Sequence, residues 1–242
     1  MLVDLHCHSF LSQGCTLDPR AVLERAAQHG LDGVCFTETN TQDGCDELFD
    51  LGRKSKVKVF VGLELNTDKG QYLCFFPRPE EAPEPVQMWG SNRERPWSAE
   101  EALPKVKALG AVIVAARPYD RDFGYPAQDY VLQLEGTLSA VEGFNPKLRQ
   151  SQNDLAVEAA EKLKLPCIGG SDARGSLDEI GWAATLFKHP LATQEDLVKA
   201  LAAGEYWPVQ MGELPRLTRP GEAREVEKRN NKKKRRRQWI KG

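Results

Sequence analysis

Residues 4–9 read DLHCHS and close the apolar run that opens the chain. The two histidines in this stretch, His6 and His8, are half of the four histidines among the 242 residues. Residues two apart on an extended strand point to the same face, so Asp4, His6 and His8 are predicted to share one face. Two imidazoles side by side at the carboxyl end of a strand suit a transition-metal ion such as zinc or manganese. Taken alone, the pair also fits a structural role.

Segments typical of strands and of helices alternate through most of the chain. Seven apolar stretches are predicted as strands, at residues 2–9, 32–39, 58–65, 70–76, 111–118, 139–145 and 166–172. Helical patterns lie at residues 17–30, 98–110, 153–164 and 193–204. Alternation of this kind predicts an α/β fold built on a parallel sheet or a barrel.

Polar side chains stand where several of these predicted strands end. They are Glu38, Thr39, Glu64, Arg117 and Asp172, with Arg174 two residues farther on. In a (β/α) barrel the carboxyl ends of the strands converge on one mouth, where polar residues are functional by default. Gly169 and Gly170 precede Asp172 and let the backbone approach closely there. Each residue alone also fits a capping carboxylate or a paired surface arginine, but together they predict a site.

Seven short motifs follow one another in an order that resembles the PHP family (polymerase and histidinol phosphatase). They are DLHCHS, TETNT, VGLEL, GQYL, AARP, VEGFN and GGSDARG, and the resemblance extends over residues 1–206. It implies an α/β fold in the form of a distorted seven-stranded (β/α) barrel. We expect this barrel domain to occupy residues 1–211, and residues 212–242 to be a charged, disordered basic tail.

The resemblance also implies a metal site, because the family's motifs carry up to three metal ions used to hydrolyse phosphate esters. His6, His8, Glu64 and Asp172 stand where the family has the ligands of one metal position. Five other expected ligands are replaced, by Gln13, Thr39, Gln71, Arg117 and Arg174. One position is therefore intact and two are lost, which implies a single divalent ion, zinc or manganese. The four intact residues also fit a hydrogen-bonded structural cluster that holds no ion.

Arg117 and Arg174 stand where the family has histidines. A guanidinium stays protonated at ordinary pH and carries five donors in a planar fork. The two arginines are therefore predicted to clamp a phosphate or carboxylate. The alternative is that they form salt bridges to Glu38, Glu64 or Asp172 and close the pocket.

Two functions follow from these residues, and we favour the first. It is a PHP-type metal-dependent phosphoesterase with one ion, acting on a phosphorylated small molecule or a nucleic-acid end. Arg117 and Arg174 would stabilise charge on the transferring group, and Asp172 or Glu38 would take the proton. The second is a catalytically inactive PHP-like barrel that binds an anionic ligand or nucleic acid.

Charge is distributed unevenly along the chain. Residues 228–242 hold nine lysines and arginines and no acid, so subtracting them from the formal net charge of −2 leaves −11 on residues 1–227. Such a basic tail is predicted to contact nucleic acid nonspecifically, or else to serve as a solubilising or localising extension.

Composition and motifs also bear on where the protein works. The longest apolar stretch, residues 110–116, is too short to span a bilayer, and the six cysteines form no CxxC pair. No basic segment followed by an apolar segment opens the chain. We expect a cytoplasmic protein with free thiols and no membrane partner.

Overall fold

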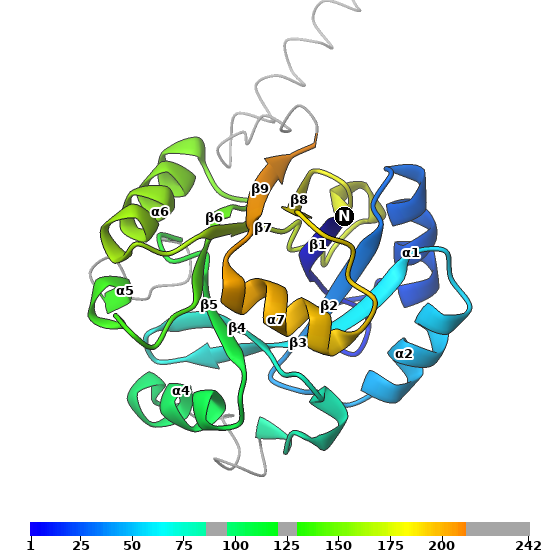
Figure 1. Ribbon diagram of the computed structural model, residues 1–242. Coiled ribbons are helices and arrows are strands. Elements are labelled where there is room, and N and C mark those ends of the chain that lie inside the picture. The colour runs from blue at the N-terminus through cyan, green and yellow to red at the C-terminus, as the bar shows by residue number, and fades with distance from the viewer. Residues whose placement is uncertain (86–95, 121–129, 212–242) are drawn as a thin grey trace, which may run out of the picture.

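The computed structural model describes residues 1–85, 96–120 and 130–211, so the predicted tail at 212–242 lies outside the described residues. Nine strands form one sheet that curls into a nearly closed barrel (Figure 1). They are β1 (Leu2–Cys7), β2 (Gly33–Thr39), β3 (Lys58–Thr67), β4 (Gly70–Phe75), β5 (Val112–Ala116), β6 (Ala140–Phe144), β7 (Cys167–Gly169), β8 (Ala183–Phe187) and β9 (Tyr206–Gln210). The predicted α/β barrel is confirmed, with two strands more than the seven expected.

The two extra strands, β8 and β9, continue the sheet beyond β1 in the order β7-β6-β5-β4-β3-β2-β1-β8-β9. β8 runs antiparallel to β1, and β9 runs antiparallel to β8. Their sequence signal is weak because each has five residues and β9 contains Pro208, which cannot donate to a ladder. Thr185 of β8 exchanges hydrogen bonds with Gly169 of β7, which links the first strand of the sheet order to the last strand but one.

Strand direction differs from the expected parallel arrangement at β4. The pairs β1–β2, β2–β3, β5–β6 and β6–β7 are parallel, whereas β4 is antiparallel to both β3 and β5. Only Asp68 and Lys69 separate β3 from β4, and a parallel crossover needs about a dozen residues or more. The hairpin has a consequence for the site, because Gln71 at the start of β4 pairs with Asn66 near the end of β3.

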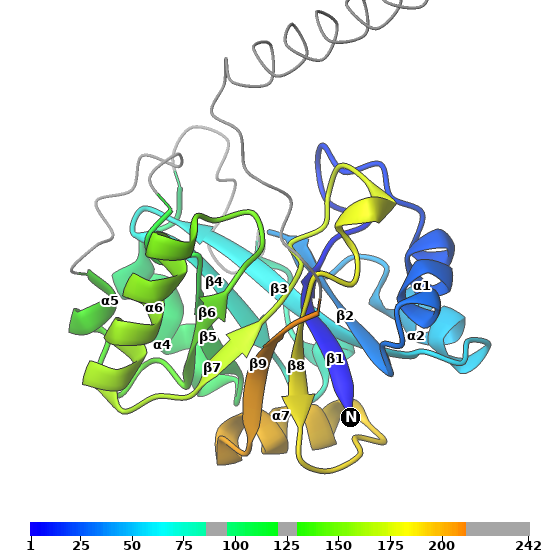
Figure 2. The same ribbon diagram turned by 90° about the horizontal axis from the view of Figure 1, so that it is seen from above.

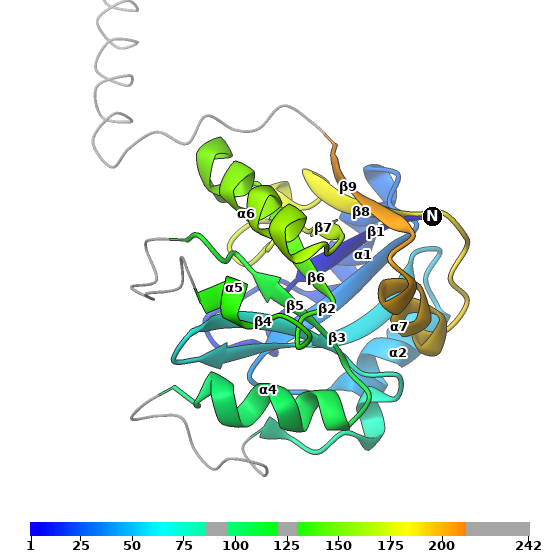
Figure 3. The same cartoon turned by 60° about the vertical axis from the view of Figure 1, so that its left-hand side comes forward.

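Helices cover the outside of the barrel and one of its ends. They are α1 (Pro19–Gln28), α2 (Cys45–Arg53), α4 (Ala99–Ala108), α5 (Tyr130–Gln133), α6 (Gln150–Leu163) and α7 (Gln194–Ala203), with single 3-10 turns η1 (Pro79–Glu81) and η2 (Leu177–Glu179). Figures 2 and 3 show α1 and α2 on one side of the sheet and α4, α5 and α6 on the other. α7 lies across the end of the barrel where β1 begins (Figure 2).

The barrel interior is apolar toward α7 and polar at the opposite end. Leu5 of β1 and Phe60 of β3 pack with Leu197 and Leu201 of α7 in one buried cluster. Gln194 anchors the start of α7 by accepting a hydrogen bond from the Val61 amide and donating to the Val61 carbonyl. This apolar floor leaves the carboxyl end of β1, with its histidines, as the functional mouth.

Two further expectations concern membranes and thiols. None of the helices in the described residues is long and apolar enough to cross a membrane. All six cysteines are free thiols, as expected, and Cys7, Cys35 and Cys74 are buried in the core.

Candidate metal centre

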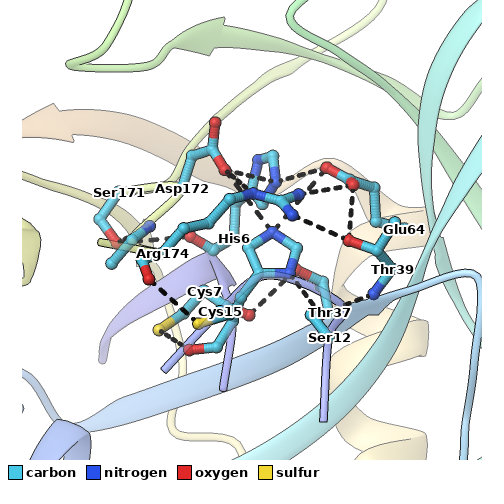
Figure 4. A network of polar contacts seen from close by, with 12 residues as sticks. His6, Cys7, Ser12, Cys15, Thr37, Thr39, Glu64, Ser171, Asp172 and Arg174 are labelled. Atoms are coloured by element: carbon cyan, nitrogen blue, oxygen red, sulfur yellow. Dashed lines mark hydrogen bonds and ion pairs between the residues drawn. The ribbon is translucent and has the colours of Figure 1, made fainter. Parts of the chain in front are cut away.

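Four predicted ligands, separated widely in the sequence, meet at the mouth of the barrel. His6, His8, Glu64 and Asp172 each offer one ligand atom, and these atoms all lie within 4.8 Å of one another. All four side chains are buried. Figure 4 shows three of them, His6, Glu64 and Asp172, converging from β1, from β3 and from the segment after β7.

The hydrogen on the His8 ring can be placed from its neighbours. Ser12 Oγ donates to Glu38 Oε2 at 2.5 Å and accepts from the Thr39 amide at 2.8 Å. The 3.1 Å contact between His8 Nδ1 and Ser12 Oγ must therefore be a donation from Nδ1. Burial lowers the pKa of His8 to about 4, so the ring is neutral and Nε2 carries a lone pair.

That lone pair is the best test of whether these residues fit a metal ion. Among the described residues, His8 Nε2 is buried without a hydrogen-bond partner. It faces two carboxylate oxygens, Glu64 Oε2 at 3.8 Å and Asp172 Oδ1 at 3.6 Å. A lone pair directed at two anionic oxygens is unfavourable unless a cation lies between them. Two imidazole nitrogens and two carboxylate oxygens match zinc or manganese, so the residues fit the ion.

His6 is held by carboxylates on both ring nitrogens. Its Nδ1 lies 2.8 Å from Glu142 Oε1, and its Nε2 lies 3.0 Å from Glu64 Oε2. Burial opposes a charge on the ring, but the Glu142 and Asp172 charges and the two hydrogen bonds outweigh burial and raise the pKa of His6 to about 10. Without an ion, His6 is therefore a cation between two carboxylates, and binding of an ion at Nε2 displaces a proton.

Glu142 is a site residue that the sequence analysis missed. Its motif VEGFN was recognised, but no role was assigned to the glutamate. The available signal was an acid in the middle of β6, a strand whose five residues are all buried. A buried carboxylate needs hydrogen bonds or a counter-charge, so its presence there indicates polar partners inside the barrel.

The two carboxylate oxygens of Glu64 have different surroundings. Oε1 accepts from three donors: Arg174 Nη2 at 2.6 Å, Thr39 Oγ1 at 3.0 Å and Gln71 Nε2 at 3.2 Å. All three donors stand where the resemblance implied ligands of the lost metal positions. Oε2 faces His6 and His8. The residues that stand in place of the family's ligands thus surround one oxygen of Glu64. The other oxygen is directed into the four-residue cluster.

Arg174 forms the salt bridges that the sequence analysis gave as the alternative to an anion clamp. Its Nε lies 3.1 Å from Asp172 Oδ1, and its Nη2 pairs with Glu64. Nη1 donates to Thr39 Oγ1 at 3.0 Å. These contacts use three of five N–H groups, and 26% of the side chain is exposed. Arg174 therefore neutralises the cluster and still faces the mouth.

Arg117 is more deeply enclosed, with 8% of the residue exposed. Its Nη1 lies 3.0 Å from Asp172 Oδ2, and its Nη2 donates to Gln71 Oε1. Arg117 and Asp172 both have left-handed backbone conformations, with φ of 44° and 51°. Non-glycine residues in this region are strained by about 1–3 kcal/mol each and tend to occur at functional sites.

Asp172 and Glu38, the two predicted proton acceptors, differ in basicity, and Asp172 is the weaker base. Burial would raise the pKa of Asp172, but the charges of His6 and Arg117 and the His8 contact hold it well below its usual range. Burial raises the pKa of Glu38, although hydrogen bonds from Ser12 and Ser9 partly offset the rise. Glu38 contacts neither arginine guanidinium in the described structure. Of the predicted site residues only Gln13 is exposed.

Comparisons with known proteins identify the family of this barrel. A model of the PHP domain matches residues 4–117, and a PHP-associated model matches residues 150–206. The chain contains a PHP domain. Its four-residue cluster is a possible metal site.

Two curated relatives are similar in sequence. An uncharacterized protein from Methanocaldococcus jannaschii is 28% identical over 173 residues, which are 67% of this chain and 92% of that protein. The phosphoribosyl 1,2-cyclic phosphate 1,2-diphosphodiesterase of Eggerthella lenta is 33% identical over 100 residues, which are 39% of this chain and 38% of the enzyme. The second match spans well under half of the enzyme's length.

Solved structures share the barrel fold of this chain. PsfC from Pseudomonas syringae superposes with a TM-score of 0.65 at 22% identity, covering 89% of this chain and 93% of PsfC. A two-domain Bacteroides vulgatus protein containing a predicted PHP-like metal-dependent phosphoesterase superposes with a TM-score of 0.68 at 17% identity, covering 87% of this chain and 65% of that one. The predicted PHP-type barrel is therefore confirmed.

Gly170 allows the segment that carries Asp172 to lie against β1. A Cβ atom at this position would lie 2.4 Å from His6 Cβ and 2.7 Å from the His6 amide nitrogen. We expect Gly170→Ala to lower the free energy of unfolding by about 1–3 kcal/mol, because backbone must shift to accept the methyl group. Urea denaturation measures this loss. Gly175→Ala is the matched control, since its Cβ would meet Glu179 Oε1 at an ordinary 3.5 Å. Equal stability of the two variants would contradict the prediction.

Proposed function

We propose that this protein is a phosphoesterase that works with one divalent ion, zinc or manganese, held by His6, His8, Glu64 and Asp172. The environment of Glu64 carries the proposal. Its Oε1 is surrounded by Arg174, Thr39 and Gln71, whereas its Oε2 faces the unpartnered His8 Nε2. This arrangement supports one ion beside Oε2. Beside Oε1, where the resemblance implies further ions, hydrogen-bond donors stand instead.

The ion, when bound, would lower the pKa of a water molecule and polarise the phosphoryl oxygen. Arg174 is proposed to bind the phosphate, because it is partly exposed and carries N–H groups beyond the three described contacts. Arg117 is proposed to act mainly by orienting Asp172, with which it pairs at 3.0 Å. Their positive charges would stabilise the charge that develops on the transferring group.

Proton transfer is better assigned to Glu38 than to Asp172. The low pKa of Asp172 makes its carboxylate a weak base, whereas burial raises the pKa of Glu38 toward the working pH. Ser12 Oγ already donates to Glu38 Oε2 and lies next to His8. We propose that Glu38 accepts the proton, with the hydroxyls of Ser12 and Ser9 holding its carboxylate in place. Asp172 then serves as a ligand.

The substrate class proposed is a phosphorylated small molecule, with a nucleic-acid end as the alternative. The Eggerthella lenta relative is named for hydrolysis of a cyclic sugar phosphate, which supports a phosphate ester. The direct test is elemental analysis of protein purified without a metal-affinity tag, followed by a phosphatase screen with added zinc or manganese. About one ion per chain and a hydrolysed phosphate ester are expected. Absence of both would reject the proposal.

Arg174→Met should lower kcat by about 10²–10³-fold if this guanidinium stabilises the transferring phosphoryl group. Steady-state kinetics on the substrate found in the screen measure the effect. Arg174→Lys should recover part of the rate, since it restores the charge but not the planar fork. Arg20→Met, which removes an exposed arginine from α1, is the charge-matched control. An Arg174→Met enzyme with wild-type kcat would exclude the proposed role.

One observation favours the second function, a catalytically inactive barrel that binds anions. Glu64 and Asp172 already pair with Arg174, Arg117 and the His6 cation, so the cluster has counter-charges without an ion. Under this alternative the purified protein holds no metal, and phosphate binding falls on Arg174→Met without any hydrolysis. Nucleic-acid contact through residues 228–242 also remains a proposal, tested by binding before and after deletion of this segment.

A further inference from the structure

Glu142 links the His6 ring to the backbone of Arg117 through its two carboxylate oxygens. Oε1 lies 2.8 Å from Nδ1 of His6, a proposed metal ligand. Oε2 accepts from the backbone amide of Arg117 at 3.0 Å and from Asn145 Nδ2 at 3.3 Å. The residue is fully buried, so no water competes for these oxygens. One carboxylate thus contacts both a ligand ring and the strained backbone of an arginine.

The two groups that face Oε2 can only donate hydrogen bonds. A backbone N–H is always a donor, so the Arg117 amide requires an acceptor oxygen. The Asn145 side chain is oriented as well, because its Oδ1 accepts from the Lys147 amide at 2.9 Å and its NH2 group is left facing Glu142. The atom at the Oε2 position must therefore be an acceptor.

The Oε1 side determines where the hydrogen on His6 lies. With an acceptor at Oε1, His6 carries a hydrogen on Nδ1, which leaves Nε2 as the atom for an ion. Carboxylates that hold a histidine ligand in this way typically contribute 10–100-fold to metal affinity. A glutamine at this position would have one oxygen only. The fixed donors would take that oxygen, and its NH2 group would face His6 Nδ1.

We propose that Glu142 is the positioning residue that sets the tautomer of His6 for metal binding while it holds the Arg117 backbone in place. The inference rests on the proposed one-ion function. In the wild-type protein an ion displaces the Nε2 hydrogen and Nδ1 keeps its own, which Glu142 accepts. In Glu142→Gln, Nδ1 must become an acceptor, so the only hydrogen on the ring is the one on Nε2. An ion that displaced it would force an Nδ1 hydrogen against the NH2 group of the glutamine. The variant is nearly isosteric, so the change affects the direction of hydrogen bonds more than packing.

Zinc affinity measured against a chromophoric chelator tests the effect on metal binding. Glu142→Gln should bind zinc about 10–100-fold more weakly than the wild-type protein. Asp4→Asn is the matched control, because Asp4 is an equally buried carboxylate that accepts from the backbone amides of Ser171 and His6 and not from the ring. It should keep zinc affinity within about threefold, below the range for a residue that orients a ligand.

A long-range ¹H–¹⁵N spectrum of the histidine rings tests the tautomer without relying on metal or activity. The wild-type protein should show a hydrogen on His6 Nδ1 with and without zinc, and Glu142→Gln should lack it. Wild-type His6 without that hydrogen would overturn the inference even if the variant failed to fold. Wild-type zinc affinity in Glu142→Gln would overturn it too.

The spectrum also separates this inference from the proposed function. If the wild-type protein binds no zinc but Glu142→Gln loses the Nδ1 hydrogen, the one-ion function fails and the positioning role of Glu142 stands. If the wild-type protein binds zinc and Glu142→Gln retains both the hydrogen and the affinity, the metal site stands and Glu142 does not position it.

Discussion

His8→Ala is expected to weaken zinc binding by more than about 100-fold, beyond the 10–100-fold range for residues that only orient a ligand. The reason lies in the lone pair on Nε2, which Ser12 and Glu38 direct into the cluster by fixing the hydrogen on Nδ1. Alanine removes this ligand nitrogen, so only His6, Glu64 and Asp172 remain to hold the ion. Competition with a chromophoric chelator measures the loss, and hydrolysis should disappear with it.

The control for His8→Ala must remove a histidine without touching the mouth. His189→Ala does so, since 71% of its side chain is exposed and its only described ion-pair partner is Glu205. This variant should bind zinc as the wild-type protein does. Equal zinc affinity in His8→Ala and His189→Ala would mean that the ion binds elsewhere or nonspecifically, and the one-ion site would be wrong.

Arg117→Met should lower the free energy of unfolding of the metal-free protein by about 3 kcal/mol. Removing one partner of a buried ion pair typically costs about 3–5 kcal/mol, because the remaining charge stays buried without compensation. Arg117 also pairs with Asp120 at 3.6 Å, but the closer partner left behind is Asp172, which keeps Arg174 at 3.1 Å and His6 at 3.5 Å. These partners place the expected loss at the low end of the range.

Urea denaturation of the metal-free protein measures the effect of Arg117→Met. Arg78→Met is the control, because Arg78 pairs with Glu81 on the surface, where about 60% of each side chain is exposed. An exposed pair contributes only about 0–1 kcal/mol, so this variant should stay close to the wild-type protein. A similar small loss in Arg117→Met would show that the pair with Asp172 adds little to the fold.

Local patterns in the sequence were sufficient for an α/β fold on a parallel sheet or barrel and for the polar residues at its strand ends. The spacing of His6 and His8 on one strand, and the glycines before Asp172, are properties of neighbouring residues. Strand and helix patterns depend on local periodicity, and parallel strands with carboxyl ends at one mouth bring their terminal residues together. These rules predicted a polar site, and the resemblance to the PHP family implied that His6, His8, Glu64 and Asp172 share one metal position. The structure places the four residues together.

The sequence by itself therefore determined the α/β fold class and the polar residues at the ends of the predicted strands, but not the part played by Glu142 within β6. The tertiary structure alone decided how they pair: Glu142 with His6, 136 positions away, and Arg174 with Glu64, 110 positions away. It also decided that β8 and β9 join the sheet and that β4 runs antiparallel to its neighbours. Such choices depend on which donors and acceptors lie within about 3 Å after folding, and hydrogen bonds and buried ion pairs at that range leave no trace in local periodicity.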